Sequence, residues 1–418
     1  MSEENSPVKT ISAILLAVLL MGIGSALLAT AVSIRAGLEG VSEQLLGFIM
    51  SGYYIGLILG TFLSGRFIRS VGYVRSFAAF ASIASIAGFL HVLVVSPVVW
   101  FFLRVMVGVC LAVMEVVVES WLNVTSVNTN RGRILSLYSI VLLASMGLGQ
   151  PLIGRFSPSS FEVFGISAII ISLCLIPVTL AKISGTARVS KSRPQITKTF
   201  LRSPLAGIGV IVSGFLYGST WSLMPRYGQQ VGLSEARIGF VMLLIALGTL
   251  TFQWPLGVMS DRKGRLPAIF VSLCVTVGSS MFIAVTGTGG PLFYIVSFIF
   301  GGFGMPLYSL SVALINDQLR TDEMVQAAGT IILFYGIGSV AGPVLSGALM
   351  SRIGPSGLYY AMAVPTVLYL FFALSRIRKA VRKPGRERAK YKTYPRTTAA
   401  IFSLLKKSRK KKNVPDSK

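Results

Sequence analysis

Charged residues are scarce in this sequence. Asp, Glu, Lys and Arg make up 13% of its 418 residues, hydrophobic residues make up 53%, and the mean hydropathy is +0.74. Soluble domains contain about 25% charged residues. The shortage excludes a soluble protein of this length and predicts an integral membrane protein with about a dozen helices of ~20 residues each.

Cysteine and histidine are also rare. Cys110, Cys174 and Cys274 lie in apolar runs without paired spacing, which predicts buried thiols and neither a disulfide nor a metal site. His91, the only histidine, lies near the outer end of an apolar run, where a structural role is the more common one. Because no Gly-Lys-Ser/Thr phosphate-binding loop is present, we expect no direct use of ATP. We predict no cofactor, no metal and no enzymatic activity.

Acidic residues are few, 14 against 39 Lys and Arg, and the net charge is +25. The basic residues are concentrated in alternate loops and both termini, which argues against nucleic-acid binding and follows the positive-inside rule. The rich side, with both termini, is therefore predicted to be cytoplasmic, and the number of spans to be even. Few basic residues depart from this pattern: Arg35, Arg104, Arg155, Arg226, Arg237 and Arg352.

Twelve apolar runs are present, six before and six after a basic gap. They cover about 11–34, 44–65, 76–96, 98–122, 134–154, 163–181, 205–226, 237–258, 267–287, 291–316, 325–350 and 357–375. We take the first run as a span and not as a cleavable signal peptide. The predicted organisation is a six-helix bundle (1–181), a cytoplasmic linker (182–204), a second six-helix bundle (205–375) and a polybasic tail (376–418).

A basic, glycine-punctuated segment occurs in each half, at Gly65–Gly72 and, 192 positions later, at Gly257–Gly264. We expect each copy to form a short turn between two spans. Arg69 stands where the second copy has Asp261. The repetition predicts a duplicated helical bundle, the layout of a secondary transporter.

The fourth apolar run contains three charged residues, Arg104, Glu115 and Glu119. In a helix, Glu115 lies about 20° and Glu119 about 60° around the axis from Arg104, so the three share one face. Arg104 and Glu115 are ~16 Å apart along the axis and cannot pair directly. A charge inside a membrane costs about 2.5–3.5 kcal/mol, which requires a partner or a watery cavity. We predict that Glu115 and Arg104 couple transport to protons; structural ion pairing is the alternative.

Carboxylates and basic residues at the cytoplasmic ends predict ion pairs that hold these ends together in one transport state and break in another, and we call such pairs latches. Permanent ion pairs are the alternative. We expect Glu119 to pair with a basic residue of the first half, and Asp317 with one of the second half, while Asp261 can cap or bridge. The candidate partners are Arg69, Arg75, Arg131 and Arg133 in the first half and Arg262 and Arg265 in the second.

Aromatic and polar residues inside the spans are candidates for substrate contact. We expect a central cavity lined mainly by the first, fourth, seventh and tenth spans. The principal candidates are Tyr53, Tyr217, Trp221 and Tyr308, with Tyr54, Gln253 and Trp254 as further ones.

The repeated segment resembles the loop signature of the major facilitator superfamily, and Gly257–Arg265 fits it closely. Leu103–Gly108 looks like the helix 4 signature of that superfamily, seen in many proton-coupled members, and the Gly-Pro elements near Pro151 and Pro343 are similar to its helix 5 signature. A closer likeness is to the YcaD-type branch. It rests on Val116–Ser120, Asn130–Arg133, Ser222–Pro225, Ile238–Phe240 and Gln253–Pro255.

The resemblance implies twelve transmembrane helices in two pseudo-symmetric bundles, cytoplasmic termini and alternating access. Glu115 and the long tail depart from that branch. We expect a multi-pass transporter of the bacterial inner membrane that moves a small solute, coupled to protons, with the basic tail contacting anionic lipids. Two alternatives are a lipid-facing protein, either a lysolipid flippase or a nontransporting sensor, and an uncoupled facilitator.

Overall fold

The structure is a computed structural model that describes residues 7–126, 130–181, 200, 202–287, 290–319 and 324–380. Within these residues, twelve helices are long and apolar enough to cross a membrane, as predicted. The first half contains α1 (Pro7–Leu38), α2 (Glu43–Val71), α3 (Tyr73–Leu93), α4 (Pro97–Thr125), α5 (Arg131–Leu148), the 3₁₀ turn η1 (Gln150–Gly154), α6 (Glu162–Leu173) and α7 (Leu175–Leu180). The second half contains α9 (Pro204–Gln230), α10 (Glu235–Lys263), α11 (Arg265–Thr286), α12 (Gly290–Gly304), α13 (Leu307–Gln318), α14 (Met324–Ile353) and α15 (Gly357–Ala380).

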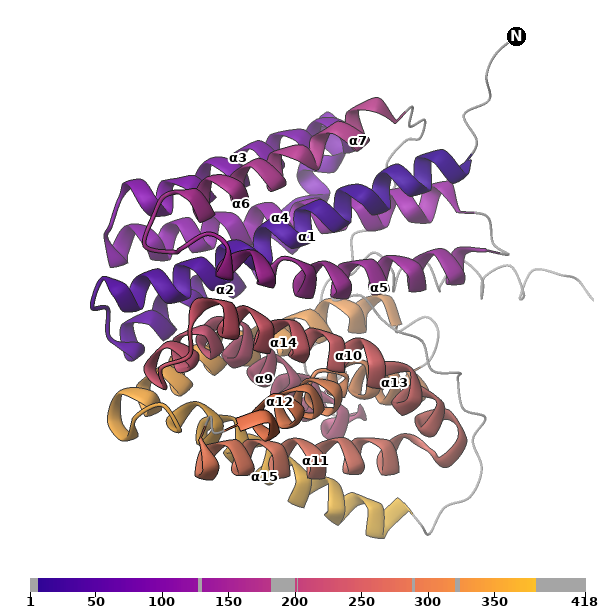
Figure 1. Cartoon of the computed structure of the whole chain (residues 1–418). Coiled ribbons are helices and arrows are strands. Elements are labelled where there is room, and N and C mark those ends of the chain that lie inside the picture. The colour runs from indigo at the N-terminus through magenta and orange to yellow at the C-terminus, as the bar shows by residue number, and fades with distance from the viewer. Residues whose placement is uncertain are drawn as a thin grey trace, which may run out of the picture.

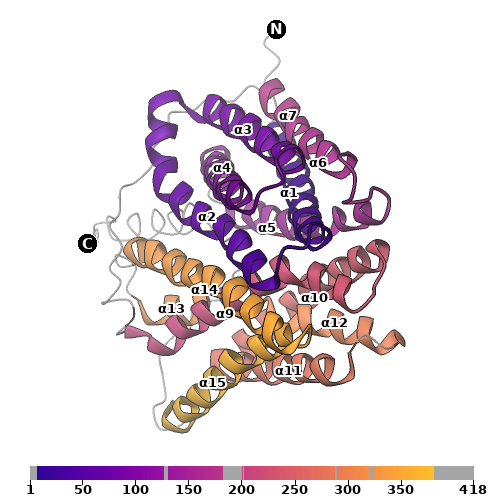
Figure 2. The ribbon, with the colours of Figure 1, turned by 90° about the vertical axis from the view of Figure 1, so that its left-hand side faces the viewer.

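The helices form two bundles that follow the order of the chain. Figure 1 shows α1 to α7 grouped together, in indigo to magenta, above the group of α9 to α15. The first residue of α1 and the last of α15 lie on the right in Figure 1, and we call this side the terminal end. The opposite side, which faces the viewer in Figure 2, contains the turn from α1 to α2 and is called the far end. The predicted linker and tail lie mostly outside the described residues.

The repeated glycine-punctuated segments are almost entirely helical, so the predicted turns are too long. Residues 65–71 belong to α2, and only Gly72, at φ 83°, separates α2 from α3. Gly264, at φ 104°, does the same between α10 and α11. A positive φ is favourable only for glycine, so one residue is enough to turn the chain. The helices therefore extend past the apolar runs and place Arg69 and Asp261 on helix ends.

The duplication extends to the far end. Ser42 caps α2 by accepting a hydrogen bond from the Leu45 amide at 3.4 Å, and Ser234 caps α10 through the Arg237 amide at 3.4 Å. Each cap precedes a glutamate, Glu43 or Glu235, in the first helical turn, where the helix dipole favours negative charge. These caps fix two carboxylates at equivalent places in the two bundles.

Candidate functional site

A narrow cavity of about 70 Å³ lies between the two bundles. Residues of α1, α2, α4, α5, α9 and α14 line it. Helices α1, α4 and α9, which are the first, fourth and seventh spans, line the cavity as predicted. The tenth span, which contains α13, does not line it, and α2, α5 and α14 do. The lining residues that matter most for its chemistry are Tyr53, Tyr54, Glu115, Met146, Tyr217 and Tyr335.

Close backbone packing of α2 against α4 positions the first bundle's share of the cavity. A Cβ atom on Gly56 would lie 2.1 Å from the Val105 carbonyl oxygen, and one on Gly108 would lie 2.1 Å from that of Tyr53. No side chain fits at such distances, so the two backbones touch directly. This packing places Tyr53 of α2 beside Arg104 of α4.

Arg104 is buried behind Tyr53 and does not belong to the cavity lining. Its guanidinium carbon lies 5.2 Å from the centre of the Tyr53 ring, a cation–π contact. Its Nε and Nη1 atoms have no hydrogen-bond partner among the described residues. Arg104 thus provides a fixed positive charge next to the cavity.

Glu115 of α4 lines the cavity directly. From residue 110 to residue 119 it is the one residue that is not fully buried, which matches a side chain facing open space. It is also the one carboxylate among the described lining residues, which include no Lys, Arg or His. Tyr53 lines the same cavity. The structure therefore separates the two predicted coupling residues into a cavity carboxylate and a buried cation.

Aromatic rings extend from the cavity across the interface. Tyr54 of α2 and Tyr217 of α9 have ring centres 6.5 Å apart, and Tyr217 lies 6.0 Å from Tyr335 of α14. Of the predicted substrate residues, Tyr53, Tyr54 and Tyr217 line the cavity. Trp221 and Tyr308 lie one layer behind, with ring centres 5.9 Å from Tyr217 and 4.9 Å from Tyr335 respectively. Sequence reasoning missed Tyr335, which only its position among the small residues of α14 could have suggested.

At the terminal end, Arg265 joins two carboxylates within the second bundle. Its Nη1 atom donates to Asp261 at 2.6 Å and its Nε atom to Asp317 at 2.9 Å. The Arg265 side chain is 4% exposed, whereas those of Asp317 and Asp261 are 13% and 32% exposed. Arg262, the other predicted partner of Asp317, is exposed. This network links α10, α11 and α13.

The first bundle has different residues at the positions that correspond to this network. Tyr73 stands 192 positions before Arg265, and its ring packs 5.6 Å from that of Trp121. Arg69 is exposed, makes no ion pair with a described residue and is not brought to Glu119. Glu119 is fully buried and accepts a hydrogen bond from Tyr138 at 3.4 Å.

The other predicted residues of this latch lie at the same end. Arg75 and Arg133 are exposed. Arg131 is partly buried and donates to the Asn123 carbonyl at 2.6 Å. The contacts of Arg131 with Asn123 and of Glu119 with Tyr138 lie within the first bundle.

At the far end, α2 and α14 lie against each other (Figure 2). Ionic and hydrogen-bond contacts join the two bundles there. Arg226 at the end of α9 donates to Glu43 of α2 at 2.7 Å. Gln230 also donates to Glu43 at 2.7 Å, and Ser33 of α1 donates to the Ser222 carbonyl at 2.7 Å. Sequence reasoning did not identify the Glu43–Arg226 pair, because its partners are 183 residues apart and each resembles an ordinary helix-end charge.

The cavity lies on the terminal side of these contacts. On α2 the far-end contacts involve 43–47, whereas the lining residues fall within 53–61. On α14 the contacts involve 343–351 and the lining residues fall within 332–339. The two bundles are thus in contact on the far-end side of the cavity.

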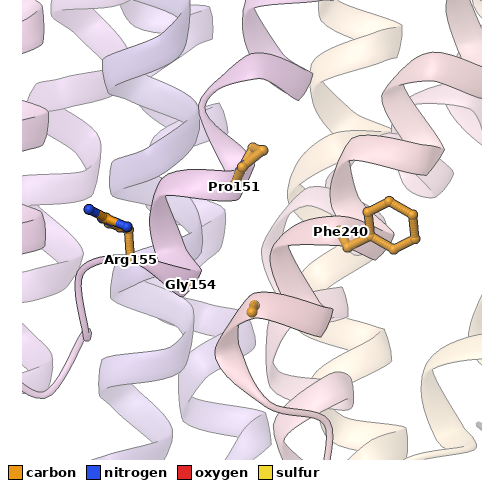
Figure 3. A pocket seen from close by; sticks show the side chains of 5 residues that line it. Pro151, Gly154, Arg155 and Phe240 are labelled. Atoms are coloured by element: carbon orange, nitrogen blue, oxygen red, sulfur yellow. The ribbon is translucent and has the colours of Figure 1, made fainter.

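A larger cleft of about 330 Å³ lies at the far end, between η1 and α10. Pro151 and Gly154 of η1, Arg155, and Ala236 and Phe240 of α10 line it. Figure 3 shows Arg155 pointing away from Phe240, so the walls between η1 and α10 are mainly apolar. The described residues that line this cleft include no carboxylate, so it lacks the chemistry of the central cavity, and we assign no role to it.

The described residues contain no group of three His, Cys, Asp or Glu side chains that could hold a metal ion. Cys110 and Cys174 are buried as predicted, but Cys274 is exposed. It lies on the outer surface of α11, where an apolar sequence faces lipid as readily as protein.

Comparisons with known proteins agree with this architecture. A family model described as Major Facilitator Superfamily matches residues 14–207 and 206–413. An uncharacterised transporter of this type, YcaD of Escherichia fergusonii, is 30% identical over 364 residues, which is 86% of this chain and 94% of that protein. The predicted resemblance to the superfamily and to its YcaD-type members is confirmed.

Solved structures share the fold at low identity. A mutant form of the nucleoside transporter NupG aligns with a TM-score of 0.75 and 12% identity, covering 88% of this chain and 99% of that one. A D-xylose-proton symporter aligns with a TM-score of 0.67 and 16% identity, covering 88% and 97%. The chain is a multi-pass membrane protein, and its bacterial relatives support an inner-membrane location.

Proposed function

Since this chain belongs to the Major Facilitator Superfamily and is a transporter, we propose that it moves a small solute by alternating access and couples this movement to protons through Glu115. The observation that supports the coupling is a single carboxylate facing the cavity between the bundles. The solute binds in this cavity, because both bundles contribute to its wall and their relative movement opens it to one side at a time.

Glu115 is suited to bind and release the proton. A carboxylate inside a membrane costs free energy, and a cavity lowers this cost because it gives the carboxylate access to water. Arg104 cannot deprotonate, so its role is different. We assign it a positioning role: it holds the Tyr53 ring by the cation–π contact. A D-xylose-proton symporter with the same fold lends general support to proton coupling.

The conformation corresponds to a state closed at the far end. Exposed Arg66, Arg69, Arg75 and Arg133 all lie at the terminal end. By the positive-inside rule this end, with both termini, is assigned to the cytoplasm. The state is then closed to the outside, and the next step of the cycle is separation of the far-end contacts.

The terminal-end carboxylates receive a different role from the far-end ones. Arg265, Asp261 and Asp317 belong to one bundle, and we propose that they keep α10, α11 and α13 together as a rigid unit. A latch between the bundles at this end, if one forms in the opposite state, would use the exposed arginines Arg69, Arg75, Arg133 and Arg262.

The test begins with a solute identified by a thermal-shift screen of the purified protein against metabolite and drug libraries at several pH values. In proteoliposomes, Glu115→Gln should abolish accumulation of that solute driven by a pH gradient, while exchange without a gradient continues. Glu162→Gln, at an exposed carboxylate on α6, is the matched control and should retain both activities. Accumulation by Glu115→Gln at the wild-type level would refute the coupling. Wild-type flux that ignores the pH gradient would favour an uncoupled facilitator.

A further inference from the structure

The walls of the cavity combine aromatic faces with one negative charge. Tyr53, Tyr54, Tyr217 and Tyr335 supply four tyrosine rings, and Met21 and Met146 supply polarisable thioethers. Glu115 is the one carboxylate, and the described lining residues include no basic side chain. Such walls attract a positive charge in two ways, by the Coulomb interaction with the carboxylate and by the negative faces of the aromatic rings.

From this lining we infer that the transported solute is a small organic cation with an apolar body, such as a substituted amine or a quaternary ammonium compound. The inference rests on the proposed transport function and specifies its substrate class. An organic anion would meet the Glu115 carboxylate with no compensating cation in the wall. The hydroxyl groups of Ser25, Thr61, Ser339 and the four tyrosines can also bind a neutral solute, so the experiment includes a neutral probe.

Arg104 is a buried positive charge near the cavity, and its position determines how strongly it acts on a bound cation. Its guanidinium lies over the Tyr53 ring at 5.2 Å from the ring centre, outside the lining. Arg104 also lies eleven residues before Glu115 on α4, about 16 Å along the helix axis, so its charge does not cancel that of Glu115. When Glu115 is protonated, the cavity wall loses its negative charge and no longer attracts an organic cation by the Coulomb interaction. Proton and organic cation therefore compete for the cavity, and one proton leaves Glu115 as one cation binds.

Other groups near Glu115 do not change this balance around neutral pH. Tyrosine hydroxyls are neutral in this range, and arginine stays charged. The parts of α1 and α5 that line the cavity contribute Met21, Gly22, Ser25, Leu142 and Met146, none of which titrates. The titratable or charged groups around Glu115 are Tyr53 and Tyr54 on α2, Tyr217 on α9, Tyr335 on α14 and Arg104 on α4.

The experiment measures binding to the purified full chain in detergent, by isothermal titration calorimetry. The probes are benzyltrimethylammonium, a cation, phenylacetate, an anion, and benzyl alcohol, a neutral compound with the same ring. We expect the cation to bind at least roughly tenfold more tightly than the other two at pH 8, and more weakly at pH 5.5, where protons compete. Tighter binding of phenylacetate or benzyl alcohol than of the cation would overturn the inference.

Variants locate the site. Glu115→Gln should weaken binding of the cation roughly tenfold and remove its pH dependence, whereas Glu115→Asp, which keeps the charge and guards against a folding defect, should retain both. Tyr217→Leu, which removes an aromatic face, should bind the cation several-fold more weakly, and Tyr217→Phe, which keeps that face, should lose much less of the binding. Glu162→Gln should behave as wild type. Unchanged affinity in Glu115→Gln would overturn the inference.

Transport separates this inference from the proposed function. Proton-driven accumulation of an anionic or neutral solute, with no cation binding, would preserve the proposed function and overturn the substrate class. Cation binding at Glu115 without any transport of benzyltrimethylammonium or of a screened amine would support the site and contradict the transport mechanism.

Discussion

Removing the negative charge of Glu43 should open the far end. Glu43 accepts hydrogen bonds from Arg226 Nη2 at 2.7 Å and Nε at 3.1 Å, and from Gln230 at 2.7 Å. These contacts join α2 of one bundle to α9 of the other. They have to break whenever the far end opens, so Glu43→Gln destabilises the closed state without a matching effect on the open one.

The side chains of Arg226 and Glu43 are 16% and 14% exposed, which determines the expected magnitude. Exposed ion pairs contribute about 0–1 kcal/mol, whereas breaking a fully buried pair costs about 3–5 kcal/mol. Partial burial, a two-nitrogen contact from Arg226 and a retained amide in glutamine together suggest about 1–2 kcal/mol. That energy changes the ratio of open to closed molecules by about 5–30-fold.

The assay measures how fast a cysteine at position 222 reacts with a polar maleimide in purified protein. Ser222 is 1% exposed in the closed state, and its contact with Ser33 uses the backbone carbonyl, so Ser222→Cys preserves it. The exposed Cys274 is first replaced by serine, because it would react with the maleimide. Cys110 and Cys174 are buried and are kept. We expect Glu43→Gln to raise the labelling rate about 5–30-fold, in proportion to the open population.

Two further variants make the prediction for Glu43 refutable. Glu39→Gln removes a carboxylate that follows the end of α1 and pairs with Arg35 at 2.6 Å, and it should leave the rate unchanged. The exchange Glu43→Arg with Arg226→Glu should return the rate most of the way to wild type. A Glu43→Gln rate equal to wild type, or an equal increase in Glu39→Gln, would show that the pair does not hold the far end closed.

The remaining predictions concern the terminal end. Arg265→Gln should destabilise the protein by about 2–3 kcal/mol, since it leaves two carboxylates without their cation, whereas Arg69→Gln should change stability by less than about 0.5 kcal/mol; denaturation midpoints measure both. Because Arg69 makes no ion pair with a described residue, exchanging Arg69 and Glu119 should rescue nothing that Glu119→Arg alone removes, and a clear rescue would establish a contact in another state. Removing residues 381–418 should leave solute transport intact but reduce association with anionic lipid, and loss of transport would favour the sensor function.

Composition and periodicity predicted most of the fold. Long apolar runs define spans because a bilayer requires about 20 apolar residues, and a basic gap after six of them predicts two bundles. The turn lengths were wrong, because hydropathy marks where the membrane ends and not where the helix ends. Residues 66–71 are polar or mixed but contain no helix breaker, so α2 continues to Val71 and only Gly72 interrupts the chain.

The site was predictable only where a residue is unusual in itself. Glu115 and Arg104 stand out because charges are costly in a membrane, and both lie at or beside the cavity. Tyr335 and the Glu43–Arg226 pair do not stand out. Tyrosines are common in spans, and charges are common at helix ends. Their importance depends on packing between segments over a hundred residues apart, which the local sequence pattern does not reveal.

The ion pairs at the terminal end lie within the second bundle, whereas an ion pair at the far end joins the two bundles. This difference indicates which contacts change in the proposed transport cycle. Contacts inside one bundle move with it and keep their length when the bundles rock, which applies to Arg265 with Asp261 and Asp317. Contacts between bundles cannot survive rocking, which applies to Glu43 with Arg226. The sequence repeat draws attention to the terminal end because its glycines and charges are duplicated there. The ion pair that joins the bundles in this state nevertheless lies at the other end.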